Sequence, residues 1–155
     1  MEIRDFLAPF QVTAGMRAPD KVRLLRELAK RAAVTLGLAS DAVADALLQR
    51  EELGSTGTGG GVALPHARLT GVDKPFAILV SLAKAIDYDS IDGRPVDIVC
   101  LLLLPASSQG EQLNALACAA RRLRDPDALR SIRRAGDDAA LYRAVAGEDA
   151  KSKSA

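Results

Sequence analysis

The chain has 155 residues, which is enough for one globular domain with its own core. Apolar residues make up 48% of it, but aromatic residues only 3%, so Leu, Val, Ile and Ala must build that core. Its 21 Lys and Arg balance 20 Asp and Glu without a long run of one sign, which argues against non-specific nucleic-acid binding as its main role.

The first part of the chain predicts a short strand and two helices. Phe10–Ala14 is the candidate strand. Apolar residues at three-and-four spacing predict an amphipathic helix over Pro19–Gly37, with the proline in its first turn. A second helix is predicted from a cap at Ser40 and is ended by Gly54. Arg50 then falls on its last turn.

The middle of the chain predicts buried strands. Phe76–Leu82 and Val96–Leu104 are apolar, rich in β-branched residues and bounded by prolines. Between them, Asp92-Gly93 is typical of a tight turn, which allows an antiparallel return. Ile86–Ile91 is a weaker candidate for a short strand or an irregular loop.

Three helices are predicted after the strand Val96–Leu104. A capping box that begins at Ser108 predicts the start of a long helix. Asp125-Pro126 starts a short helix that reaches about Arg134. Asp137 or Asp138 caps the last one.

This order of elements predicts an α/β fold. We expect a mixed β-sheet of about five strands with helices on both faces, and its strand order stays open. Residues 1–147 are interpreted as a single domain and residues 148–155 as a polar tail.

No segment of the sequence resembles an export signal or a membrane span. The charged residues Glu2, Arg4 and Asp5 interrupt the N-terminus. The longest apolar run, seven residues that end at Leu104, is far short of the ~18 that would suggest a span. We therefore expect a cytoplasmic protein that does not insert into a membrane.

The two cysteines are expected to be buried thiols. Cys100 lies in a predicted strand and Cys118 in an alanine-rich helical pattern, which fits neither a disulfide framework nor a zinc site. No metal is expected.

A glycine-rich segment precedes the single histidine of the chain, His66. Four residues separate Gly54 from Gly59, but Gly60 stands where a phosphate-binding P-loop needs lysine. A dinucleotide fingerprint counted from Gly57 would need glycine at Val62. Neither nucleotide motif fits.

His66 has two readings from the residues alone. An imidazole that titrates near neutrality beside unpaired backbone N–H groups suits the handling of a phosphoryl group. Alternatively, His66 is a loop histidine without chemistry, the glycines only supply turn conformations, and Arg50 is an ordinary cation at a helix C-terminus.

Residues 50–66, REELGSTGTGGGVALPH, resemble the active-site signature of the fructose/mannitol-type enzyme IIA domains of the bacterial phosphoenolpyruvate phosphotransferase system. The best match is the stand-alone nitrogen-regulatory branch. The resemblance continues through residues 83–97, AKAIDYDSIDGRPVD, and covers nearly the whole chain. It implies the enzyme IIA fold.

This resemblance implies that His66 is phosphorylated by a histidine phosphocarrier protein. Neutral imidazole is a nucleophile, and phosphoryl transfer needs mainly alignment and neutralisation of the phosphoryl oxygens. The Arg50 guanidinium and the phosphate-binding segment are the expected source of that neutralisation. That segment comprises Thr56, Thr58, Gly59, Gly60 and Gly61. No cofactor or nucleotide is required.

Gln112 departs from the family pattern. Family members usually carry a second histidine near the start of the helix after the central strand, and Gln112 occupies that position. An amide can donate a hydrogen bond to a phosphoryl oxygen but cannot become a cation. We expect slower transfer or a longer-lived phosphorylated state, unless Gln112 is merely a polar residue in the first turn of a helix.

The leading functional hypothesis is a regulatory phosphocarrier that selects its partners by the change of charge on phosphorylation. The resemblance implies a potassium transporter or a sensor kinase as the downstream partner. A homo-oligomer is possible. One alternative is the enzyme IIA component of a fructose or mannitol permease, which would pass the group to a IIB domain. Another is a protein-binding module that is never phosphorylated. A hydrolase with His66 as general base is weakest, because no nucleophile elbow accompanies it.

Overall fold

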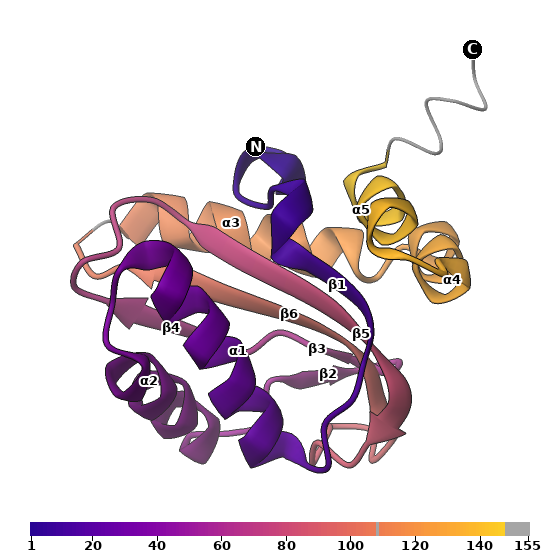
Figure 1. Ribbon diagram of the computed structural model, residues 1–155, viewed down its shortest axis with the longest axis horizontal. Helices are drawn as coiled ribbons and strands as arrows, with labels where there is room; N and C mark the ends of the chain where they lie inside the picture. Colours follow the sequence, from indigo (N-terminus) through magenta and orange to yellow (C-terminus); the bar gives the residue numbers. More distant parts are fainter. Residues whose placement is uncertain (108, 148–155) are drawn as a thin grey trace.

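The computed structural model describes residues 1–107 and 109–147 (Figure 1). Within the helix that follows the central strand, the side chains of residues 109 and 111–113 are outside this description. The predicted cap Ser108, the side chain of Gln112 and the predicted tail at 148–155 therefore lie outside the described residues.

The described chain alternates short 3₁₀ turns, strands and helices. In chain order these are η1 (Ile3–Asp5), η2 (Pro9–Gln11), β1 (Val12–Met16), α1 (Lys21–Leu36), α2 (Ser40–Glu52), β2 (Gly57–Gly59), β3 (Val62–Ala63), β4 (His66–Leu69), β5 (Phe76–Ile86), β6 (Val96–Pro105), α3 (Gln109–Arg122), α4 (Pro126–Arg134) and α5 (Asp138–Ala146).

The strands form one mixed sheet in the order β1-β5-β6-β3-β2, with β4 also paired to β6. β5 and β6 are antiparallel, from Phe76 opposite Leu103 to Ile86 opposite Val96. β1 is parallel to β5, and both β3 and β4 are parallel to β6. The mixed α/β sheet is as predicted. It has six strands because the glycine-rich segment contributes two short ones and His66–Leu69 a third.

Helices cover both faces of the sheet, which confirms the predicted layers. Alternate residues of β6 enter different clusters: Val99 and Leu101 pack with α1 and α2, whereas Cys100 and Leu102 pack with α3, α4 and α5. Figure 1 shows α1 and α2 on one side of the sheet and α3, α4 and α5 on the other. Burial on both faces explains why β6 reads as a continuous apolar run.

The helix starts differ from the sequence prediction in two places. α1 begins at Lys21, because the Asp20 carboxylate caps it by accepting from Arg23 N–H at 2.8 Å; Pro19 therefore precedes the helix. α2 has Ala39 as its N-cap, and Ser40 is already helical. In α5, Asp137 is the cap of the two predicted candidates.

The strand bounds also shift. Pro9–Gln11 form a 3₁₀ turn, so β1 begins two residues later than predicted. β5 continues to Ile86, and the loop after it contains no strand. The predicted turn at Asp92-Gly93 is present, with Gly93 N–H bonded to the Ser90 carbonyl at 2.9 Å.

Cys100 and Cys118 are both free and buried, as predicted. Burial raises the pKa of the Cys100 thiol to about 12. None of the helices in residues 1–107 and 109–147 is both long enough and apolar enough to cross a membrane.

Candidate functional site

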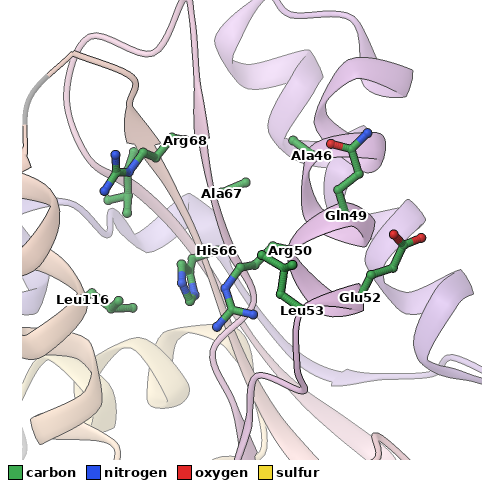
Figure 2. Close-up of a pocket in the computed structure, with 10 residues that line it drawn as sticks. Ala46, Gln49, Arg50, Glu52, Leu53, His66, Ala67, Arg68 and Leu116 are labelled. Carbon is green, nitrogen blue, oxygen red and sulfur yellow. The ribbon is translucent and has the colours of Figure 1, made fainter.

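His66 and Arg50 line a common pocket of about 700 Å³, where α2, β4, β6 and α3 meet (Figure 2). Half of the lining residues are apolar and half are polar or charged. The lining residues are Ala46, Gln49, Arg50, Glu52, Leu53, His66, Ala67, Arg68, Leu104 and Leu116.

His66 is held by the backbone around it. It is the first residue of β4 and pairs with Leu102, whose N–H bonds the Pro65 carbonyl at 2.9 Å. Its Nδ1 lies 2.8 Å from the Leu64 carbonyl oxygen. A carbonyl only accepts, so Nδ1 carries the proton in the neutral ring, and Nε2 keeps its lone pair.

The pKa of His66 is lowered from its usual value. Partial burial is the largest cause, since it disfavours the charged ring. The bond to the Leu64 carbonyl opposes this shift, the Arg50 charge adds to it, and Glu51 opposes it. The imidazole is therefore mainly neutral, and nucleophilic, at neutral pH.

Arg50 lies on the last turn of α2, as the sequence predicts. Its Nη1 donates to the Gly54 carbonyl at 3.0 Å, which holds the guanidinium against the loop that leaves the helix. Figure 2 shows this guanidinium beside the His66 ring. The structure thus brings together the predicted histidine and the predicted cation, which lie 16 residues apart in sequence.

A buried polar cluster lies behind Arg50. The Glu51 carboxylate, with its side chain only 6% exposed, pairs with Lys21 Nζ at 2.7 Å. It also accepts from the Tyr88 hydroxyl at 3.2 Å and from both the N–H and the hydroxyl of Thr56. These bonds join the start of α1, the end of α2 and the loop after β5.

The predicted phosphate-binding glycines form a hairpin turn instead of a pocket wall. Gly60 and Gly61 connect β2 to β3, with φ of 68° and 82°. Positive φ at both central residues is the geometry of a type I′ turn, which glycine adopts readily. Gly60 N–H donates to an Asp92 carboxylate oxygen at 3.0 Å, so this amide already has an acceptor.

The turn is also distant from His66 along the sheet. Val62, just after the turn, pairs with Ile98, and His66 pairs with Leu102. Four residues of strand separate these positions, or about 13 Å. The described pocket lining contains none of Gly59, Gly60 and Gly61.

A salt bridge fixes the same turn from α4. Arg133 binds both carboxylate oxygens of Asp97, at 3.0 and 2.9 Å, and donates to the Gly60 carbonyl at 2.7 Å. A Cβ at Gly61 would lie 2.6 Å from Arg133 Nη2 and 2.8 Å from Asp97 Oδ1. Only glycine fits there without displacing this clamp.

The two predicted threonines are engaged in local structure. Thr56 is 4% exposed and bonded to Glu51 and Tyr88. The Thr58 hydroxyl donates to the Val62 carbonyl at 3.4 Å, inside the hairpin. Neither hydroxyl lines the pocket.

Sequence reasoning missed the cluster around Glu51 and the second arginine of the pocket, Arg68. Arg68 lies two residues after His66 on β4 and lines the same pocket. The alternation of an extended segment would have indicated this, because residues i and i+2 of a strand share a face. No strand is predicted directly after His66 in the sequence analysis above.

No three His, Cys, Asp or Glu side chains of the described residues group as metal ligands.

Comparison with known proteins identifies relatives over almost the whole chain. The family model described as "Phosphoenolpyruvate-dependent sugar phosphotransferase system, EIIA 2" matches residues 5–147. A nitrogen regulatory protein of Bradyrhizobium diazoefficiens is 42% identical over 146 residues, which are 94% of this chain and 95% of that protein. The fructose-specific EIIA component of a phosphotransferase system in Haloferax volcanii is 37% identical over 87 residues, 56% of each chain.

Solved structures show the same fold. The crystal structure of the nitrogen regulatory protein IIA-Ntr from Neisseria meningitidis superposes with a TM-score of 0.86 at 28% identity, over 92% of this chain and 98% of that one.

Proposed function

The chain belongs to the EIIA 2 family of the phosphoenolpyruvate-dependent sugar phosphotransferase system, and we propose that it is a nitrogen-regulatory enzyme IIA protein phosphorylated on His66. The donor is a histidine phosphocarrier protein, and the phosphoryl group derives from phosphoenolpyruvate. Residues 1–147 form the phosphoryl-accepting unit, which acts in the cytoplasm.

One observation carries this proposal. The Nδ1 atom of His66 is engaged by the Leu64 carbonyl at 2.8 Å, in a pocket that Arg50 also lines. The other ring nitrogen, Nε2, therefore keeps a free lone pair next to a cation. A nucleophile and a charge for the phosphoryl oxygens are the main requirements of phosphoryl transfer.

The transfer step balances without an outside proton. The Nε2 lone pair of His66 forms the new N–P bond as the N–P bond of the donor phosphohistidine breaks. The bonding electrons return to the donor ring, which leaves as neutral imidazole because its other nitrogen already carries a proton. His66 keeps its Nδ1 proton, and the Leu64 carbonyl stabilises the positive ring that results.

The other predicted residues have supporting roles. Arg50 neutralises phosphoryl oxygens, and Gln112 on α3 offers an amide from the position of the family's second histidine. The segment from Thr56 to Gly61 shapes the loop and hairpin before His66. Its bonds to Glu51, Asp92 and Arg133 support this positioning role.

The relatives favour regulation over sugar transport. The nitrogen regulatory protein aligns over 94% of this chain, whereas the fructose-specific component aligns over 56%. Phosphorylation adds up to about two negative charges to the pocket, enough to change which protein docks there. We infer from the family resemblance that the regulated partner is a potassium transporter or a sensor kinase.

Reconstitution tests the proposal. The purified protein is incubated with phosphoenolpyruvate, enzyme I and the histidine phosphocarrier, and intact mass spectrometry measures an acid-labile gain of one phosphoryl group. The wild type is expected to be labelled and His66→Gln to remain unlabelled with an unchanged melting temperature. If the wild type stays unmodified while a control enzyme IIA is labelled, the chain is a binding module and the proposal fails.

A second measurement separates regulation from transport. The labelled protein is mixed with the IIB domain of a fructose or mannitol permease, and loss of the label is followed. We expect the label to be retained. Rapid discharge to the IIB domain would identify a permease component.

A further inference from the structure

Arg68 projects from β4 on the same side as His66. The two residues are separated by one position in an extended strand, so their Cα atoms are about 7 Å apart and their side chains leave the same face. They pair with Leu102 and Leu104 of β6, and Leu104 lines the pocket between them and α3. The position of Arg68 on β4 therefore places its side chain at the pocket.

The guanidinium of Arg68 has no hydrogen bond or ion pair with any described residue, and the side chain is exposed. The two other arginines discussed above differ. Arg50 is bonded to the Gly54 carbonyl, and Arg133 is bonded to Asp97. An exposed arginine that pairs with no carboxylate of the described residues has five donors to offer them or an incoming anion.

The two arginines of the pocket approach His66 from different elements. Arg50 comes from the end of α2, and Figure 2 shows Arg68 on the other side of the imidazole from Arg50. A phosphoryl group on Nε2 would carry about two negative charges over three oxygens. One guanidinium can bind two of these oxygens at most, so the third is open to a second donor.

Resting on the proposed phosphorylation of His66, we infer that Arg68 is a second phosphoryl-binding residue. Arg50 is held in place before phosphorylation, whereas Arg68 is free to swing from the pocket rim onto the phosphoryl oxygens. Arg68 contributes mainly to the transferring and bound phosphoryl group, since it has no partner to give up among the described residues of the unphosphorylated protein.

The test compares Arg68→Gln and Arg68→Lys with Arg134→Gln. Arg134 is an exposed arginine in the last turn of α4, outside the pocket, and its replacement changes the net charge equally. Rates of phosphorylation by the histidine phosphocarrier are measured by rapid quenching. Arg68→Gln is expected to lower the rate about tenfold, as for one lost charge-assisted hydrogen bond. Arg68→Lys, which keeps the charge, should be intermediate, and Arg134→Gln unchanged.

A second readout reports on contact with the phosphoryl group itself. Phosphorus NMR of the phosphorylated proteins follows the titration of the phosphoryl oxygens with pH. A guanidinium stabilises the dianion, so Arg68→Gln is expected to raise the pKa of the phosphoryl group and Arg134→Gln to leave it unchanged. Melting temperatures of all variants should match the wild type, since both arginines are exposed.

The outcomes are distinguishable from failure of the proposed function. If the wild type is not phosphorylated, both proposals fall. If the wild type is phosphorylated and Arg68→Gln matches Arg134→Gln in rate and titration, the role of Arg68 is wrong and phosphorylation of His66 stands. A slower rate with an unchanged phosphoryl titration also overturns it, because Arg68 would then act in docking the phosphocarrier.

Discussion

The Nδ1 atom of His66 and the carbonyl oxygen of Leu64 lie 2.8 Å apart, two residues from one another in the same chain. This bond selects the tautomer before any partner arrives. The reactive nitrogen is thus determined by the local path of residues 64–66. Nitrogen NMR of the labelled protein should find the proton on Nδ1 and the lone pair on Nε2.

The first prediction concerns the titration of His66. Its pKa is expected below 6.5, chiefly because of burial, so the phosphorylation rate should be flat around neutral pH and fall only in acid. The unfolded chain then binds the proton more tightly than the folded one. Stability should therefore decrease as the pH falls below about 6.5.

The measurement is direct because the chain has one histidine. Proton NMR gives the pKa, and urea unfolding gives the stability at each pH. His66→Gln should remove the histidine-dependent part of the pH effect. A measured pKa of His66 above 6.5 would contradict the prediction.

The second prediction concerns the buried carboxylate of Glu51. Glu51→Ala removes the only carboxylate that pairs with Lys21 among the described residues, in a site where the Lys21 side chain is 16% exposed. It also removes bonds to Thr56 and Tyr88. The free energy of unfolding should fall by about 3 kcal/mol. Urea unfolding with intrinsic tyrosine fluorescence measures this change.

Glu27→Ala is the matched control. Glu27 pairs with Arg31 on the surface of α1, and their side chains are 45% and 38% exposed. Surface pairs of this kind contribute less than about 1 kcal/mol. An equal and small cost for both variants would mean that the cluster around Glu51 does not hold the end of α2 in place.

The third prediction contrasts two adjacent glycines. Both have positive φ, but a Cβ at Gly60 meets nothing within 4 Å, whereas one at Gly61 meets the Arg133 clamp. Gly60→Ala should cost about 1 kcal/mol for the left-handed backbone alone. Gly61→Ala should cost about 2 to 3 kcal/mol, because Arg133 must also give up bonds to Asp97 and Gly60.

Chemical denaturation of the two variants gives this difference. Gly61→Ala combined with Arg133→Ala should cost less than the sum of the two single changes, since both disrupt the same clamp. Additive costs would show that the clash with Arg133 is not the cause of the larger destabilisation by Gly61→Ala.

The fourth prediction concerns the amide at position 112. Gln112→His places a group that can become a cation at the start of α3, and it should raise the rate of phosphorylation. Asn114→His, on the exposed side of the same helix, is the control. Equal rates for the wild type and Gln112→His would make residue 112 structural.

The layered fold and the location of Arg50 and His66 at one site could be predicted from sequence. β5 and β6 are long, apolar and bounded by prolines, so each strand can be predicted from its own residues. α1 and α2 show helical spacing, which places Arg50 on the last turn. The resemblance to the family signature then predicts that His66 is a functional residue.

The short strands around the glycines could not be predicted in the same way. β2, β3 and β4 have two to four residues each, and glycine carries no side chain from which to read alternation. β3 and β4 are strands because β6, more than 30 residues later, pairs with them. Because β3 and β4 pair with different parts of β6, the hairpin turn and His66 lie at different positions along the sheet.

The pocket lies at the seam between the two helical layers. Leu53 follows α2 on one face of the sheet and Leu116 belongs to α3 on the other, yet both line the cavity around His66. A protein bound there would contact both layers at once. Complex formation should therefore slow hydrogen exchange in α2 and α3 together. Binding at one small charged group would then stabilise helices on both faces of the sheet.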